Sequence, residues 1–490
     1  MNTNRHLSLF FAGIAVLFSI TTAQAQTTIG ADTADQVGSS LSLQQAVAIG
    51  IRHNLLVNQA DITAQGARIN YNQAWDYMLP TLNGSANQAI SNGRSLNPYT
   101  YQYTNTQVNS GSYGLNSNLT LFQGLQIQNS IKQYGYALDA GKMDLQQQKD
   151  NITLNVLIAY LQVLSARDLL VIAKEQANVD LVQMNRLDTL NQAGALLLLS
   201  NLTDLRGQYA GDVANIAIAA NNLEAAKINL FNFLNVPYKR DVEFDPNAFT
   251  LNIAEYADNP DSIYSTSLRT MPTVKAADLR VMSYQRALSV ARGAYYPTLT
   301  LYGSINTSYS NQATTKLPTT MTDDPTNQFV TVGGADYTVI AHNQNYADHT
   351  IAFGDQFKNN KYTQFGLQLN VPILNYLQVR NRVKQAKLNL KNQQLVNENT
   401  RLVLQQQVES AYQNMISAYK QYKSYIDQAA AYAESFRTTE IRFNEGVVNS
   451  DVYILAKNNT DRANTSLAQA KYTYIFRTKV LDFYQGKLSW

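Results

Sequence analysis

The chain has 490 residues, and 15 % of them are charged, compared with about 25 % in typical globular proteins. The net charge is +3, and Lys and Arg are scattered along the chain, which argues against nucleic-acid binding. The chain contains no cysteine, which excludes disulfides, thiolate metal sites and a lipid attached through cysteine. A neutral-polar composition of this kind suits walls that face both lipid and a water-filled lumen.

Residues 1–25 have the pattern of a secretory signal sequence. A basic start is followed by an apolar run from Leu7 to Ile20 and by the small-residue site Ala23-Gln24-Ala25. The apolar run is shorter than the about 20 residues that a spanning helix needs, so we expect cleavage, with 26–40 as an N-terminal extension. We expect no comparable apolar run in the rest of the chain, so insertion into a membrane would require a β-barrel.

The chain contains an internal repeat. Tyr113–Leu125 matches Phe365–Leu377, and Gly194 matches Gly446, each pair at an offset of 252. A register that holds without a gap from Tyr113 to Gly194 indicates rigid helices whose length cannot vary. Upstream the offset falls to 217, so the second repeat carries 35 more positions, and their Thr, Asn, Gly and Pro content predicts an exposed loop over 310–361.

The first repeat is predicted to span 41–234. It starts with a helix, which is followed by two strands whose apolar residues, such as Tyr113 and Leu115, alternate with polar ones. Alternation over about ten residues is typical of a transmembrane barrel strand, although a half-buried strand of a soluble sandwich has the same pattern. The predicted strands are about 80–92 and 111–122, and a long helical hairpin follows over about 126–234 with its tip near 194.

An equatorial connector over 235–267 leads into the second repeat, predicted over 268–490. Its elements repeat the same order: a helix, strands at about 297–309 and 362–374, and a hairpin over about 378–487 with its tip near 446. Small residues recur every seven positions along this hairpin, which is the spacing of a coiled-coil seam: Ser410, Ser417, Ser424 and Ala431.

These elements constrain the assembly. A helix of about 64 residues makes a rod of roughly 100 Å, which no compact domain can enclose. Four strands cannot close a barrel alone, because the smallest barrels have about eight, so the chain must oligomerise. A coiled-coil stalk without a barrel is the alternative.

The order of these elements over residues 41–487 resembles the TolC-like outer-membrane efflux and export channel proteins. The Leu-Pro-Thr-Leu and Tyr-Pro-Thr-Leu entries at Leu79 and Tyr296 and the hairpin end Arg442–Val452 contribute to the likeness. The resemblance implies an α+β membrane protein, a homotrimer with a 12-stranded β-barrel, four strands per chain, continuous with a long α-helical coiled-coil barrel in the periplasm of a Gram-negative bacterium.

The resemblance also implies a function. The chain would be the outer-membrane channel of a tripartite efflux or type I secretion system, open to passive passage and surrounded by outer-membrane lipid. Its partners would be a periplasmic adaptor protein and an inner-membrane transporter. Small-molecule efflux, metal efflux and protein secretion share this architecture, and the transporter sets the cargo. The alternative is a structural or adhesive coiled-coil envelope protein that forms no channel.

The hairpin tips are the candidate docking site. Gly194 and Gly446 match the hairpin glycines of the family, and glycine reaches the left-handed conformations that a tight turn needs. Ala195–Leu199 are five apolar residues in a row, which cannot all face one helix seam. We therefore expect the adaptor to contact the tip residues, although a turn without a docking role is the alternative: Gly194, Leu196, Leu197, Leu198, Gly446, Val447 and Val448.

Asp451 is the candidate for a constriction at the entrance. The resemblance places an aspartate ring here, but in this chain the aspartate falls one residue early, and a solvated aspartate at a helix end is the alternative. Arg442 and Phe443 are weaker candidates for a lock between helices. The sequence contains none of the common nucleophile, phosphate-binding or zinc motifs, and His342 and His349 share a loop without fixed geometry. We therefore predict no enzyme activity, cofactor or metal site.

Overall fold

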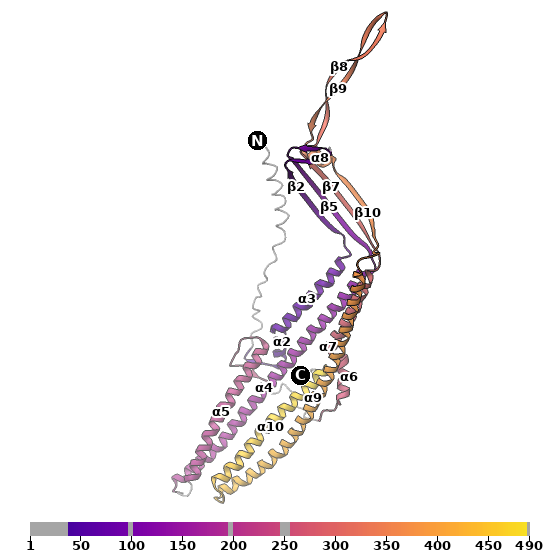
Figure 1. The fold of residues 1–490 in the computed structure, drawn as a ribbon. Coiled ribbons are helices and arrows are strands. Elements are labelled where there is room, and N and C mark those ends of the chain that lie inside the picture. Colours follow the sequence, from indigo (N-terminus) through magenta and orange to yellow (C-terminus); the bar gives the residue numbers. More distant parts are fainter. Residues whose placement is uncertain (1–37, 97–100, 195–198, 246–254, 488–490) are drawn as a thin grey trace.

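The computed structural model describes residues 38–96, 101–194, 199–245 and 255–487. The predicted signal sequence, 1–25, lies outside them. Figure 1 shows an elongated subunit in which a β-sheet separates a projecting hairpin from a bundle of long helices.

The first repeat contains helices and strands in the predicted order. The helix predicted at the start of this repeat is two helices, because Asn54 ends the first and caps the second. The Asn54 side-chain oxygen accepts from the Leu56 N–H at 2.9 Å. The elements are β1 (Ser40–Leu41), α2 (Leu43–His53), α3 (Leu55–Asp76), β2 (Thr81–Ser91), β3 (Arg94–Leu96), β4 (Tyr103–Asn105), β5 (Val108–Gln123), α4 (Gln126–Gln192) and α5 (Leu199–Leu234).

The second repeat starts earlier than expected, inside the predicted connector. A helix begins at Pro260 and is interrupted at Met271, because the proline that follows has no N–H and starts a new helix. The elements are β6 (Glu243–Phe244), α6 (Pro260–Thr270), α7 (Pro272–Gly293), β7 (Thr298–Ser310), β8 (Thr314–Val332), β9 (Ala335–Thr350), α8 (Phe353–Asn359), β10 (Tyr362–Asn370), α9 (Gln378–Asn444) and α10 (Ser450–Tyr484).

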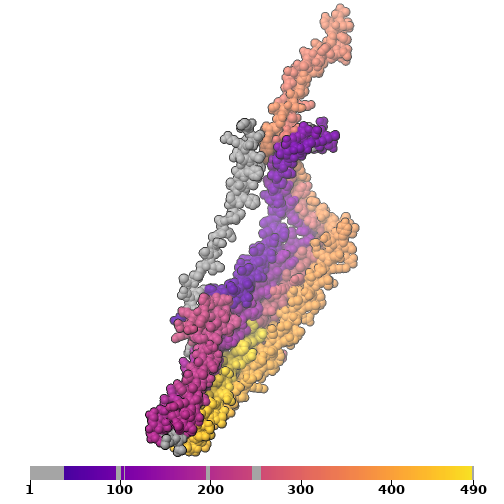
Figure 2. Space-filling view, turned by 60° about the vertical axis from the view of Figure 1, so that its left-hand side comes forward, coloured from indigo at the N-terminus to yellow at the C-terminus, as the bar shows by residue number. Residues whose placement is uncertain are grey.

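The prediction of a loop over 310–361 was wrong. Strands β8 and β9 form a long antiparallel hairpin, which projects beyond the rest of the subunit as a thin arm (Figures 1 and 2). Gly333 and Gly334 make its turn with φ of +63° and +89°, the left-handed pair that a two-residue hairpin turn requires. The many Thr residues suit a strand through β-branching, a signal that the polar composition concealed.

One four-stranded antiparallel sheet has the order β10, β7, β5, β2. Its central pair joins the two repeats, because β5 belongs to the first and β7 to the second. The pairing gives the sheet one apolar face, which includes Leu115, Ile305 and Leu367, and one polar face, which includes Asn116 and Ser304. Within the described residues, β2 and β10 each pair on one side only, so the sheet has two free edges.

The long helices α4 and α9 have 67 residues each, which corresponds to about 100 Å. Each starts after a leucine in the left-handed conformation, Leu125 with φ of 60° and Leu377 with φ of 59°. The offset of 252 between the two repeats therefore holds at both ends of α4 and α9. Figure 1 shows α3 and α7 beside their upper parts and α5 and α10 beside their lower parts.

Contrary to expectation, α4 contains a second long apolar stretch. One 18-residue window of this helix has a mean hydropathy of 1.8, apolar and long enough to cross a membrane. Its residues form the main hydrophobic core with α2, α5 and the end of α10, and the fully buried ones include Val156, Leu157 and Tyr160. The Tyr160 hydroxyl donates to the Leu41 carbonyl and accepts from the Asp245 N–H, both at 3.0 Å. Packing within the subunit therefore buries 44 % of this window.

The junction of sheet and helices depends on two glycines. Gly124, with φ of +57°, and Gly293, the last residue of α7, approach so closely that a Cβ on Gly293 would lie 2.6 Å from the Gly124 carbonyl oxygen. The equivalent of Gly124 in the second repeat is Tyr376, which is 99 % exposed and meets no such neighbour. The glycine requirement is therefore confined to one of the two repeats.

We expect Gly293→Ala to lower the stability of the subunit by about 1–3 kcal/mol, because the added methyl group meets backbone that cannot turn aside. Gly66→Ala in α3 is the matched control, since nothing lies within 4 Å of its Cβ position and alanine favours the helix by up to about 1 kcal/mol. Thermal unfolding followed by circular dichroism measures both. Equal midpoints for the two variants would contradict the close approach.

Candidate functional site

Both helical hairpins end in a glycine with positive φ. At the tip of α9, the Gly446 N–H donates to the Phe443 carbonyl at 3.0 Å and the Val447 N–H to the Arg442 carbonyl at 2.8 Å. These two bonds and the φ of +72° at Gly446 form a Schellman motif, which satisfies the last carbonyls of the helix. Gly194, with φ of +96°, ends α4 through a bond to the Asn191 carbonyl.

A small hydrophobic cluster joins all four helices just above these turns. Phe443 of α9 and Tyr453 of α10 stack with ring centroids 4.7 Å apart and an interplanar angle of 27°. Leu187 of α4 and Leu202 and Leu205 of α5 complete the buried set. Phe443 therefore belongs to the core of its own subunit, where it joins α9 to α10, and the lock between helices stays a prediction.

Polar contacts connect the two hairpins at the same level. The Gln183 amide donates to the Asn444 side-chain oxygen at 2.9 Å, and Arg186 donates to the Asn444 carbonyl at 3.0 Å. On the other side, the Ser450 hydroxyl donates to the Asp204 carboxylate at 2.6 Å. The hairpin tips of one subunit are therefore fixed to each other and present one combined surface.

The other predicted tip residues lie around this cluster. Asp451 is exposed in the first turn of α10, where a carboxylate is favoured by the helix dipole, and it accepts from the Asn449 amide at 3.3 Å. Arg442 and Val447 are exposed, whereas Val448 packs partly against the cluster. Leu196, Leu197 and Leu198 lie outside the described residues.

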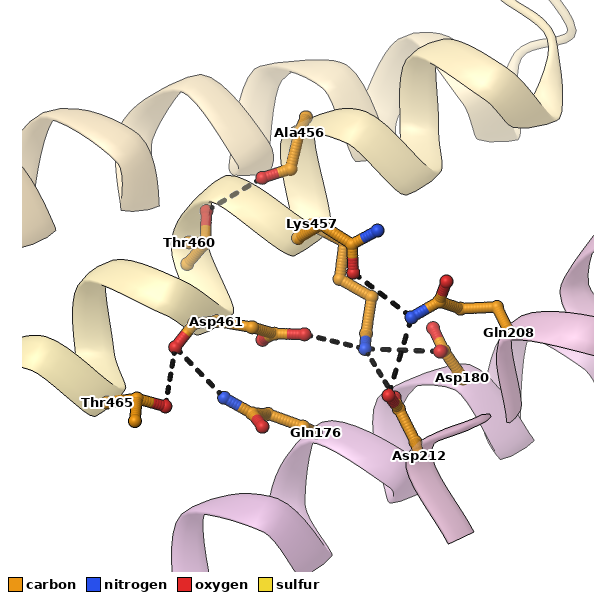
Figure 3. Close-up of polar contacts among 10 residues, drawn as sticks. Gln176, Asp180, Gln208, Asp212, Ala456, Lys457, Thr460, Asp461 and Thr465 are labelled. Atoms are coloured by element: carbon orange, nitrogen blue, oxygen red, sulfur yellow. Dashed lines mark hydrogen bonds and ion pairs between the residues drawn. The ribbon is translucent and has the colours of Figure 1, made fainter. Parts of the chain in front are cut away.

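A buried ion cluster lies farther from the tips, between the two hairpins (Figure 3). The Lys457 ammonium of α10 lies 2.7 Å from Asp212 of α5, 2.7 Å from Asp461 of α10 and 3.1 Å from Asp180 of α4. The side chains of Lys457 and Asp180 are 1 % and 0 % exposed, so both charges are fully removed from water. Three helices from both hairpins therefore meet at one ammonium group.

The four groups hold an excess of negative charge. Within the described residues, Asp180 makes no hydrogen bond besides its ion pair with Lys457. Burial raises the pKa of Asp180 to about 7 and also raises the pKa of Asp461, and in both cases the ammonium opposes this effect. Burial acts to lower the pKa of Lys457, but the carboxylates outweigh it, so that pKa is raised. The lysine of the cluster therefore stays charged, and Asp180 takes up a proton at a higher pH than an ordinary aspartate does.

Sequence reasoning missed this cluster. Only the spacing of Lys457 and Asp461, four residues apart on one helix, was visible, and such pairs usually lie on a solvated face. One further signal was available in the repeat. At the offset of 252, Asp180 corresponds to Tyr432 and Lys457 to Leu205, so each buried charge replaces an uncharged residue of the other repeat.

Comparison with known proteins agrees with this architecture. A sequence model of the family described as outer membrane efflux protein matches residues 263–483. The outer membrane protein TolC of Escherichia coli strain K12 is 24 % identical over 427 residues, which cover 82 % of this chain and 74 % of TolC. Together these matches support a TolC-like outer-membrane channel. These findings confirm the predicted family, the function as an efflux channel and the location in the outer membrane. The family is one of transport proteins rather than of enzymes.

Solved structures share the fold of this TolC-like channel. CusC superimposes with a TM-score of 0.70 at 15 % identity, covering 91 % of this chain and 92 % of CusC. The open state of the MtrE outer membrane channel of Neisseria gonorrhoeae gives a TM-score of 0.68 at 17 % identity, covering 91 % of this chain and 88 % of MtrE. The predicted fold class is therefore confirmed at the level of the whole chain.

We expect Lys457→Met to destabilise the lower helices of the TolC-like channel by about 3–5 kcal/mol, because three carboxylates lose the buried cation that they share. Adding Asp180→Asn and Asp212→Asn to this variant should restore most of the loss. Lys142→Met is the control, because its ion pair with Asp139 is more than half exposed and contributes about 0–1 kcal/mol. Thermal unfolding measures all three, and an equal loss for Lys457→Met and Lys142→Met would refute the cluster.

The cluster also predicts a pH dependence. A carboxyl whose pKa is higher in the folded protein stabilises the fold at low pH, and this stability is lost as pH rises from the unfolded value of about 4 to the folded value of about 7. Asp461 acts in the same direction, and the raised pKa of Lys457 leaves that group charged throughout this range. The joint between the hairpins should therefore loosen between about pH 4 and pH 7.

Asp180→Asn imitates the protonated carboxyl and should remove this loosening. Amide hydrogen exchange over 452–465 should match wild type near pH 4 and be slower than wild type near pH 8, with a difference on the order of 1–3 kcal/mol in opening free energy. Asp188→Asn is the control on the same helix, since Asp188 pairs with Arg206 at an exposed position. If the difference in opening free energy between wild type and Asp180→Asn is the same at both pH values, that result would count against the raised pKa.

Proposed function

We propose that three copies of this chain assemble into the outer-membrane outlet of a tripartite export system. Each copy contributes four strands to a 12-stranded barrel and two helical hairpins to a tunnel in the periplasm. Substrate passes through passively, since the energy is supplied by an inner-membrane transporter. A periplasmic adaptor connects that transporter to the hairpin tips.

The free edges of the sheet carry this proposal. β2 and β10 present rows of unpaired N–H and C=O groups, and such groups cost several kcal/mol each in lipid. Pairing β10 of one copy with β2 of the next removes every edge once the ring closes. Three copies give 12 strands, above the minimum of about eight and wide enough for a lumen.

The two faces of the sheet suit the two sides of such a barrel. Phe365, Leu367 and Leu369 on the apolar face are 85 %, 63 % and 64 % exposed in the single subunit, which favours contact with lipid tails. The paired polar face, with residues such as Asn116, Ser304 and Gln368, would line a wet channel.

The tips are the proposed docking site for the adaptor. Figure 1 shows the lower ends of α4, α5, α9 and α10 at the end of the subunit that is farthest from the sheet. Val447 is 65 % exposed there, which is unfavourable unless a partner covers it, and the apolar run at Leu196, Leu197 and Leu198 adjoins the other turn. Asp451, exposed in the first turn of α10, is the proposed lining of the narrow entrance, where three copies would attract cations.

Planar-bilayer conductance tests the proposal. The purified protein should form trimers that resist SDS and should open discrete cation-selective pores. Asp451→Asn should lower the ratio of cation to anion permeability, whereas Asp323→Asn, in the projecting hairpin, should leave it unchanged. A structural or adhesive coiled-coil protein would give no pores, and that result would reject the channel.

A further inference from the structure

The short helix α8 lies at the upper end of the sheet, between the projecting hairpin and β10 (Figure 1). Its two phenylalanines contact side chains of one face only. Phe353 lies 5.1 Å from the ring of Tyr309 and 6.2 Å from that of Tyr113, and Phe357 lies 5.8 Å from Tyr113. By the strand register, Tyr113 and Tyr309 share a face with Leu115 and Ile305. Helix α8 therefore covers the top of the apolar face.

The helix is fixed in this place by a buried glutamine. The Gln356 side chain is 1 % exposed, and its oxygen accepts from the Ser310 N–H at 2.9 Å. Its amide donates to the carbonyls of Ser310 at 2.9 Å and Ile351 at 2.7 Å. The Asn360 amide and the Thr307 hydroxyl add bonds between α8 and β7, at 2.8 and 2.9 Å. Such an amide network orients α8 firmly on the sheet.

Exposed aromatic and basic groups occur together on α8 and just after it. Phe353 and Phe357 remain 45 % exposed each despite their contacts with the sheet. Lys358, in the last turn, and Lys361, just beyond the helix, are exposed as well, and Asp355 is the one acidic residue of this helix. An aromatic body with a cationic rim fits a lipid–water interface, where rings enter the acyl boundary and ammonium groups meet phosphates.

The height of α8 agrees with that level of a membrane. Tyr296 is 59 % exposed just before the lower end of β7, and Tyr309 lies near the upper end of the same strand. At about 3.3 Å per residue and a tilt of about 40°, the roughly 13 residues between them span about 33 Å along the membrane normal. An apolar band of about 25 Å flanked by two aromatic girdles requires about this separation.

We propose that α8 is an interfacial anchor, seated in the outer leaflet with Phe353 and Phe357 at the acyl boundary and Lys358 and Lys361 at lipid phosphates. This inference rests on the proposed barrel and adds a lipid contact that the first repeat lacks within the described residues. It also assigns a purpose to the Gln356 network. Because β9 leads directly into α8, a helix held at the membrane surface aims the β8–β9 hairpin away from the bilayer.

Spin labels test the anchor, since the absence of cysteine allows single labels without a background. Phe357→Cys, Phe365→Cys, Ser112→Cys and Thr338→Cys are each labelled and reconstituted in vesicles of phosphatidylethanolamine and phosphatidylglycerol. Oxygen, which concentrates in lipid, is compared with a water-soluble nickel chelate as the relaxing agent. Phe365 marks the apolar face, Ser112 the polar face at the height of Tyr113, and Thr338 the projecting hairpin.

The label at 357 should favour oxygen over the chelate several-fold more than the labels at 112 and 338. A label at 357 as open to the chelate as that at 338, with a lipid-exposed label at 365, would overturn the anchor and leave the barrel standing. Chelate access at both 357 and 365 would instead reject the proposed barrel.

The lysines are tested separately. Lys358→Gln with Lys361→Gln, added to the Phe357→Cys protein, should make the label more accessible to the chelate. Lys316→Gln, on the projecting hairpin, is the control and should have no effect. Unchanged access in the double variant would refute the contact between these lysines and lipid phosphates.

Discussion

A sheet of four strands placed in lipid must find partners for the backbone groups along its two edges, because nothing in the hydrocarbon can bond to them. This requirement explains the arrangement of the strands in the subunit. It fixes the strands β2 and β10 as contact surfaces and makes a single copy incomplete. It also explains why β5 and β7 pair across the repeats: the central ladder joins two half-sheets into one subunit before any second copy arrives.

The two repeats differ in sequence and structure mainly where they contact each other. The first needs Gly124 where α7 approaches, whereas Tyr376 in the second faces open space. The second carries the projecting hairpin and the anchoring α8. Farther down, a lysine and an aspartate replace uncharged equivalents and meet between the hairpins. The long helices α4 and α9 have equal length in the two repeats, and these local differences supply the contacts that join the two hairpins.

The long helices and four sheet strands followed from periodicity and from the fixed offset, since a 67-residue helix repeats its pattern many times. The β8–β9 hairpin was missed because its strands are polar on much of both faces and give no alternation. The Lys457 cluster was missed for a different reason. Asp180 and Asp212 belong to the first repeat and Lys457 to the second, and only tertiary packing makes a charge on a helix face buried. The glycine turns at 194 and 446 could be predicted from the sequence, because a tight turn between helices requires a positive φ.

The apolar stretch of α4 has a consequence for biogenesis. Every outer-membrane protein crosses the inner membrane unfolded, and a window with a mean hydropathy of 1.8 approaches what the translocation machinery diverts sideways into the bilayer. Arg167 and Asp168 lie in the same helix, and a charged residue at the centre of a spanning helix opposes insertion by about 2.5–3.5 kcal/mol, so this pair favours passage of the precursor into the periplasm.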